Sequence, residues 1–167
     1  MGKSNLYYPP VGFHFDVRIL GVSDAVEMVT AASGVTPNIE GKFSEVSGLS
    51  FELKKEPYIE GGENRFTYQL PTNIEYAPLI LKRGLVSSSS ALWIWVQDTM
   101  AMGLSSPVEI KNIMVTLLSD ENAPLMGWLF INAYPTKWQV SDMNAMQNEI
   151  MVESVEFAYH RFEKFNL

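Results

Sequence analysis

Cysteine is absent from this 167-residue sequence, and the only histidines are His14 and His160. Without cysteine the chain has no disulfide and no thiolate that could act as a nucleophile or as a metal ligand. Two histidines are too few for a multi-histidine metal centre, and no segment has the spacing of a nucleophile elbow or a phosphate loop. We therefore predict that the protein is not an enzyme and has no catalytic residue, metal or cofactor.

Positive charge is also scarce, because 12 Lys and Arg residues stand against 19 Asp and Glu, which gives a formal net charge of −7. Nucleic acids and anionic lipids are bound by clustered cations, so we predict no nucleic-acid interface. The longest apolar runs, residues 77–81 and 91–96, are far shorter than the ~20 residues of a membrane helix. Residues 1–10 lack the apolar segment of a secretory signal. We expect a chain without a membrane anchor that is assembled in the cytoplasm.

Apolar residues are plentiful enough for one packed core, at 47% of the sequence against 19% charged residues. One hydrophobic core serves roughly 100–200 residues, so the length corresponds to a single domain. The apolar residues recur mainly at every second position, the period of a strand with one buried face. This alternation runs through residues 13–19, 51–54, 126–130, 133–140 and 149–162, and residues 110–118 are apolar on both faces. We predict one mainly β domain over residues 1–167, an antiparallel barrel or sandwich.

One segment has the period of a helix instead. Four serines at residues 87–90 offer hydroxyl groups for an N-cap. Mostly apolar side chains follow at helical spacing, namely Leu92, Trp95, Val96, Thr99 and Met100. We predict one amphipathic helix over residues 88–103 that flanks the sheet. Residues 21–41 have no clear period, and we predict that they form a long loop.

Residues 149–162 form an unusually long alternating run. Typical strands have about 5–6 residues, and a small barrel has no room for a straight strand of this length. We expect the run either to bend sharply or to continue into a sheet that is shared with neighbouring copies of the chain.

Six short segments, taken in order, resemble one protein family. They are residues 43–49 (FSEVSGL), 58–64 (YIEGGEN), 79–85 (LILKRGL), 128–140 (WLFINAYPTKWQV), 141–145 (SDMNA) and 155–162 (VEFAYHRF). Together they are similar to the tail-tube proteins of contractile phage tails and of extracellular contractile injection systems. The resemblance covers residues 13–162, nearly the whole chain.

This resemblance implies a small β-barrel flanked by one helix that assembles as six-fold rings. The rings stack into a hollow tube inside a contractile sheath, and shortening of the sheath drives the tube through a target envelope. The implied partners are further copies of the chain in a homohexamer, the sheath protein, baseplate and cap proteins, and a protein cargo in the lumen. The implied location is a phage tail-like particle, either released or associated with an envelope.

Within this framework we assign two sets of residues. The first set comprises turns and charges that we expect to contact neighbouring subunits or rings: Glu45, Ser47, Gly48, Glu60, Gly61, Gly62, Asn64, Lys82 and Arg83. We interpret the glycine pair of this set as a tight turn at the rim of the barrel, with a positive φ at one glycine.

The second set lies on two hairpins, built from the strands near residues 43–58 and 133–162, whose apolar face we expect to pack on the helix. Their polar positions are expected to line the lumen: Glu52, Lys54, Glu56, Glu153 and His160. An ordinary solvated sheet face is the alternative interpretation of these positions. Two other functions also stay open: a baseplate-proximal paralogue that initiates the tube, and a monomeric β-barrel that binds a ligand.

Overall fold

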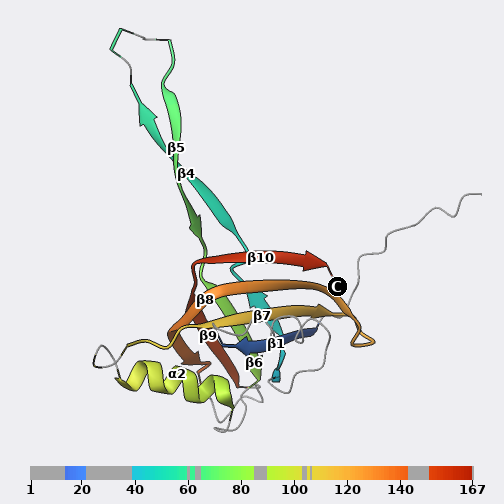
Figure 1. Ribbon diagram of the computed structural model, residues 1–167. Coiled ribbons are helices and arrows are strands. Elements are labelled where there is room, and N and C mark those ends of the chain that lie inside the picture. The colour runs from blue at the N-terminus through green and yellow to red at the C-terminus, as the bar shows by residue number, and fades with distance from the viewer. Residues whose placement is uncertain are drawn as a thin grey trace, which may run out of the picture.

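The computed structural model of the chain describes residues 14–21, 39–59, 61–62, 65–84, 90–102, 105, 107–142 and 151–166 (Figure 1). Its elements are β1 (His14–Leu20), β2 (Ile39–Phe43), β3 (Glu45–Ser47), β4 (Phe51–Tyr58), β5 (Tyr68–Tyr76), β6 (Leu79–Gly84), α2 (Ala91–Met102), β7 (Lys111–Leu118), β8 (Pro124–Val140), β9 (Val152–Ala158) and β10 (Arg161–Asn166). The strands pair antiparallel throughout. The prediction of a mainly β, antiparallel fold with a flanking helix is confirmed.

The main sheet closes on itself as a small barrel. Its strands follow the order β2-β1-β7-β8-β9-β6-β3. The first and last strands of this order are almost continuous in the chain, because only Ser44 separates β2 from β3. The Ser44 amide donates to the carbonyl of Lys82 at 2.9 Å, which joins this segment to β6, while β2 pairs with β1 on the other side. Closure leaves these strands without an exposed edge at the seam.

Alternate side chains of the strands fill the barrel, as the period of two predicts. The fully buried ones include Val17, Leu81, Val115, Phe130 and Phe157. Helix α2 packs on this core through Trp95, whose ring stacks on Phe157 with the centroids 5.5 Å apart. Figure 1 shows α2 across one end of the barrel, with the hairpin of β4 and β5 projecting from the other end.

Helix α2 is slightly shorter than the predicted helix over residues 88–103; residues 88–89 and 103 lie outside the described part of the chain. The serine run supplies the N-cap as expected, because the Ser90 hydroxyl accepts a hydrogen bond from the Trp93 amide at 3.1 Å. Leu92, Trp95 and Val96 are buried. The predicted stripe is wrong at its end, since Met100 is 44% exposed.

The long run near the C-terminus bends sharply. It divides into β9 and β10, with Tyr159 and His160 between them, and both strands lie against β8. The register continues through the break, because Ile131 of β8 lies opposite Arg161 and Tyr134 opposite Ala158. Of the two expected alternatives, the structure shows the bend, and the sharing of a sheet with neighbouring copies remains a prediction.

The corner in β8 lies at Asn132, which has a positive φ of 55°. The backbone amide of Asn132 donates to the side-chain oxygen of Asn112 at 3.0 Å, because its conformation removes it from the ladder. Asparagine tolerates this conformation better than most residues. Because of this corner, β8 and the run of β9 and β10 opposite it extend along two sides of the barrel. Of the predicted loop over residues 21–41, residues 22–38 lie outside the described part, and residues 39–41 belong to β2.

Candidate assembly surface

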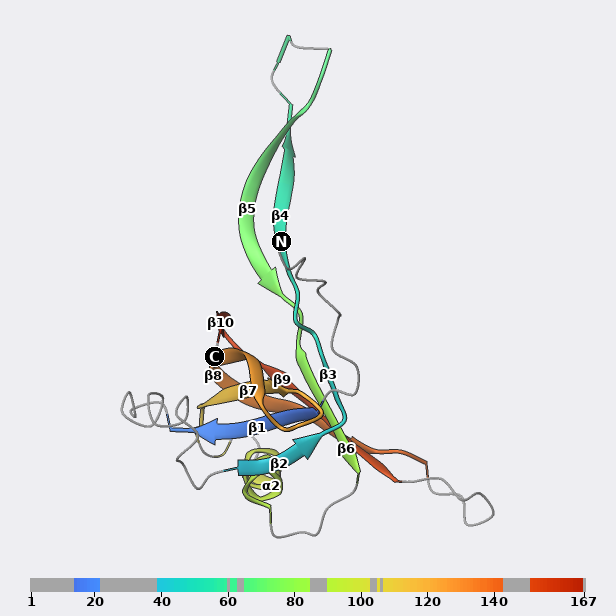
Figure 2. The same cartoon turned by 90° about the vertical axis from the view of Figure 1, so that its right-hand side faces the viewer.

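The most exposed element of the described structure is the hairpin of β4 and β5. Within the described part of the chain these two strands pair with each other alone, and both views show them projecting far from the barrel (Figures 1 and 2). Phe51 is 65% exposed and Leu53 is 56% exposed, and other large apolar side chains are also exposed: Tyr58, Ile59, Phe66, Tyr68, Leu70 and Ile74. A lone two-stranded hairpin is marginally stable in water, and grouped exposed apolar side chains mark interaction surfaces.

The register of the hairpin separates an apolar face from a charged face at its base. Phe51 lies opposite Tyr76 and Leu53 opposite Ile74, so these four side chains share one face. Because the apolar face of β4 is exposed, the expectation that it packs on the helix is wrong for this hairpin. It is confirmed for the second predicted hairpin, where Trp138 of β8 and Phe157 of β9 contact Trp93 and Trp95 of α2.

The charged face carries three residues of the predicted lumen set, Glu52, Lys54 and Glu56, which alternate along β4. Glu52 lies directly opposite Glu75, an arrangement of like charges that destabilises a sheet. The ammonium group of Lys54 compensates by lying 2.9 Å from Glu75 Oε2 and 3.3 Å from Glu52 Oε2. Its hydrogen bonds with Glu75 and then Glu52 raise the pKa of Lys54 above its ordinary value. These residues form one exposed face, and its position in a lumen remains a prediction.

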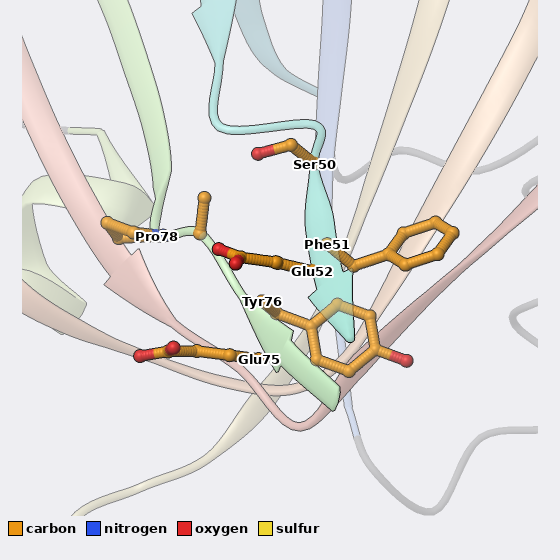
Figure 3. Close-up of a pocket in the computed structure, with 7 residues that line it drawn as sticks. Ser50, Phe51, Glu52, Glu75, Tyr76 and Pro78 are labelled. Carbon is orange, nitrogen blue, oxygen red and sulfur yellow. The ribbon is translucent and has the colours of Figure 1, made fainter. Parts of the chain in front are cut away.

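The base of the hairpin borders an open pocket of about 440 Å³, lined by Ser50, Phe51, Glu52, Glu75, Tyr76, Ala77 and Pro78. Figure 3 shows the carboxylates of Glu52 and Glu75 on one side of the strands and the rings of Phe51 and Tyr76 on the other. No group of three or more potential metal ligands occurs among the residues that the structure describes. The pocket is a gap beside the joint between hairpin and barrel.

The predicted glycine turn lies at the tip of the hairpin, so its assignment to the barrel rim is wrong. Gly61 and Gly62 lie between β4, which ends at Tyr58, and β5, and Gly62 has a φ of 106°, as a tight turn requires. Chain neighbours aside, no atom of the described residues lies within 4 Å of the Cβ position at either glycine. Glu60 and Asn64 lie outside the described residues.

Glu45, Ser47, Gly48 and Lys82 lie on β3, β6 and the start of the link to the hairpin. Lys82 Nζ lies 2.7 Å from Glu45 Oε1 of the same chain, on neighbouring strands. Gly48 has a φ of 90°, and a Cβ there would lie 1.8 Å from the carbonyl oxygen of Pro78. Gly48 is therefore required by the close approach of the two chain segments, and contacts of these four residues with a neighbouring copy remain predictions.

Two predicted surface residues, Arg83 and Glu153, are buried together, so their assignments are wrong. Arg83 Nε lies 2.9 Å from Glu153 Oε2, with side chains that are 3% and 5% exposed. The second carboxylate oxygen of Glu153 accepts a hydrogen bond from the Trp138 indole at 2.8 Å. Arg83 Nη2 donates to the Ser90 hydroxyl at 3.0 Å. This network ties β6, β8 and β9 to the N-cap of α2, and it leaves neither charge for a lumen or a neighbouring subunit.

His160 is exposed and lies at the corner between β9 and β10, in the region of the second predicted hairpin, and its position in a lumen remains a prediction. Its Nδ1 lies 3.1 Å from Asn132 Nδ2. The predicted lumen set therefore divides among three places: the hairpin face, the buried network and this corner.

Sequence reasoning missed the second strand of the hairpin and the aromatic residue at its base. The proline at position 71 and a shift of register after Leu53 obscure the alternation in β5. Tyr159, the aromatic residue, donates its hydroxyl group to the carbonyl of Ala77 at 2.8 Å. The apolar residues among positions 66–76 could have indicated this second strand, because two apolar runs on either side of a glycine turn are typical of a hairpin.

A closed barrel that carries an exposed apolar hairpin defines a class of subunit that is completed by assembly. The family model described as T4-like virus tail tube protein gp19 matches residues 11–163. The chain belongs to this family of tail tube proteins, and it is a structural tube protein. A search of curated proteins finds no match.

Solved structures with the same fold come from contractile injection systems. A chain in the anti-feeding prophage (AFP) baseplate has a TM-score of 0.70 at 23% identity, with 96% of this chain and 98% of that chain covered. A chain in the PVC sheath-tube complex in the extended state has a TM-score of 0.71 at 21% identity, with coverages of 97% and 95%. A chain in the AFP tube-terminating cap has a TM-score of 0.72 at 23% identity, with coverages of 99% and 97%. Among the described residues, no helix has the length and apolar character needed to cross a membrane.

Proposed function

We propose that this chain forms homohexameric rings that stack into the inner tube of a contractile injection system. In this proposal the tube lies inside a contractile sheath and is driven through a target envelope when the sheath shortens. The chain acts as a structural subunit without catalytic activity. It assembles in the cytoplasm into a phage tail-like particle.

The observation that carries the proposal is the exposed apolar face of the β4–β5 hairpin. Phe51, Leu53 and Ile74 project from strands that have no third strand beside them in the described structure. Burying one such side chain fully stabilises a contact by about 1.5–3 kcal/mol. A face of several such residues therefore favours an interface with a neighbouring copy, and repetition of that interface builds rings and then a tube.

The proposed partners follow from the assemblies in which similar chains occur. These are a sheath-tube complex, a tube-terminating cap and a baseplate. We therefore propose sheath, cap and baseplate proteins as partners. The charged face of the hairpin has three carboxylates, Glu52, Glu56 and Glu75, and one compensating cation, Lys54. In a lumen this acidic face would repel nucleic acid, which favours a protein cargo.

The test is assembly of the purified chain and of two variants that each add one negative charge. Leu53→Glu places the charge on the apolar face of the hairpin, and Gln97→Glu places it on the exposed side of α2. We expect rings or tubes for the wild type and for Gln97→Glu in size-exclusion chromatography and negative-stain microscopy. Leu53→Glu should remain monomeric but still unfold in one cooperative transition, at a melting temperature that does not depend on protein concentration. A wild-type chain that stays monomeric at high concentration would refute the proposal.

A baseplate-proximal tube initiator is the second candidate, because a chain of similar fold belongs to the AFP baseplate. The same microscopy separates the two functions. A main tube subunit elongates into tubes of many rings, whereas an initiator stops at a single ring.

A further inference from the structure

The hairpin is joined to the barrel by two short links that lie against each other. One link, residues 48–50, leads from β3 into β4, and the other, residues 77–78, leads from β5 into β6. The Ala77 amide donates to the carbonyl of Ser50 at 3.1 Å, and the Ser50 amide donates to the carbonyl of Gly48 at 2.8 Å. The first hydrogen bond holds the two links to each other and the second lies within one link, so neither fixes the links to the rest of the barrel.

Tyr159 supplies a contact from the barrel to both links. It lies in the break between β9 and β10, so its backbone is outside the ladder and its side chain extends from the corner. Its hydroxyl group donates to the Ala77 carbonyl at 2.8 Å and lies 3.4 Å from the carbonyl oxygen of Gly48. The first distance is that of a good hydrogen bond and the second that of a weak one.

The ring of Tyr159 also belongs to an aromatic cluster that spans the joint. Phe51 and Tyr76, the cross-strand pair at the base of the hairpin, both approach Phe162 of the barrel, with centroids 6.0 and 5.8 Å away. Tyr159 lies 5.8 Å from Tyr76 and 4.9 Å from Phe130 in the core. Aromatic pairs at these separations are worth about 0.5–1.5 kcal/mol beyond their burial.

An open pocket borders the joint. It is lined by both links and by residues of both faces of the hairpin base, among them Phe51, Glu52, Glu75 and Tyr76 (Figure 3). The joint is therefore not enclosed by packing on all sides, and a hairpin released from the Tyr159 hydroxyl has room to change its direction.

We propose that Tyr159 is a positioning residue, which fixes the direction of the hairpin through its hydrogen bond to the Ala77 carbonyl and its contact with the Gly48 link. This role deepens the proposed tube function, because a long arm turns a small rotation at its base into a large displacement at its tip. Copies whose arms lean would present their apolar side chains out of position for the neighbouring subunit. Burial raises the pKa of Tyr159 to about 12, so the hydroxyl remains a donor at every physiological pH.

The test uses Tyr159→Phe, which keeps the ring and removes the hydrogen bond. Because the chain has no cysteine, spin labels can be placed cleanly at Gln69→Cys on β5 and Glu121→Cys in the turn after β7. Pulsed electron paramagnetic resonance then measures the distance between hairpin and barrel in monomeric protein, with Leu53→Glu present in every sample. We expect Tyr159→Phe to shift and broaden the distance distribution. In the unlabelled chain without Leu53→Glu, it should raise the critical concentration for tubes about fivefold, the factor of one uncharged hydrogen bond.

Tyr134→Phe is the matched control, because it removes the hydroxyl group of an exposed tyrosine on β8. The control should leave both measurements at their wild-type values. The proposal is overturned if Tyr159→Phe leaves the distances unchanged, even when it weakens assembly, since the hydroxyl would then act through stability alone. It is also overturned if Tyr134→Phe gives the same shift. The distance measurement needs no tube, so a wild-type chain that fails to assemble would refute the tube function and leave this result interpretable.

Discussion

Glu153→Gln removes the negative charge that faces Arg83 inside the barrel wall, and it tests whether this pair holds the fold together. The variant keeps the size of the side chain but removes the negative charge 2.9 Å from the buried Arg83 Nε. Arg83 keeps its hydrogen bond to the Ser90 hydroxyl and its contact with the Phe43 ring, both of which are uncharged partners. Breaking a buried pair by removal of one partner costs about 3–5 kcal/mol. For a domain of this size we expect the melting temperature to fall by on the order of 6–20 °C.

Glu45→Gln is the matched control, because it breaks an ion pair between neighbouring strands, from Glu45 on β3 to Lys82 on β6. Glu45 and Lys82 are 2.7 Å apart, but their side chains are largely solvated. Pairs of this kind contribute about 0–1 kcal/mol. The two variants therefore make the same chemical change, one in the interior and one at the surface.

The assay is thermal and urea unfolding followed by circular dichroism, with Leu53→Glu present in every sample so that assembly does not add to the measured stability. The double variant Arg83→Met with Glu153→Leu should recover part of the loss, because apolar residues of similar volume replace buried pairs well, although the Trp138 indole loses its acceptor. Equal costs for Glu153→Gln and Glu45→Gln would refute the reasoning. So would a double variant less stable than Glu153→Gln alone.

Two further predictions concern the joint between hairpin and barrel. Gly48→Ala should lower the free energy of unfolding by more than the ~1–3 kcal/mol of a strained φ, because its Cβ would also meet the Pro78 carbonyl. Gly61→Ala at the open tip should change the free energy of unfolding by no more than about 0.5 kcal/mol in the same assay. The pKa of Tyr159 is raised to about 12 by burial and then by Tyr76, so the folded state favours the neutral phenol. The contribution of this phenol to the free energy of unfolding is complete below pH ~10 and is lost as the pH rises toward 12. An ultraviolet absorbance titration should show a late-ionising tyrosine that disappears in Tyr159→Phe; a wild-type protein without this late component would contradict the burial of the hydroxyl.

Local patterns were enough to predict the fold class and the helix. The period of two identified β1 and much of β8, and a run that is apolar on both faces identified β7. The serine run with its apolar stripe identified α2. All these signals act within one segment. Strand β5 gave no such signal, since Pro71 and a shift of register interrupt its alternation. The break between β9 and β10 is marked only by a change of phase, because the alternation of Val155, Phe157 and Tyr159 is followed by Phe162 at an even position.

The candidate residues depended on contacts that no local pattern contains. Glu52, Lys54 and Glu56 share a face because strand alternation fixes it, so their grouping was predictable. Arg83 and Glu153 are far apart in the chain, and only the pairing of β6 with β9 brings them together. Charge alone assigned both to the surface, whereas the closure of the barrel and the position of α2 bury them.

The two links of the hairpin also determine how a pushing force enters the barrel. Load on the projecting arm reaches β3 and β6 together, and these strands are paired to each other. From β6 it passes to β9 across hydrogen bonds that lie perpendicular to the strands. Bonds in this orientation resist sliding as a group, whereas bonds that are peeled apart fail one after another. A projecting hairpin anchored in this way would transmit the thrust of a contraction without separating the barrel strands that support it.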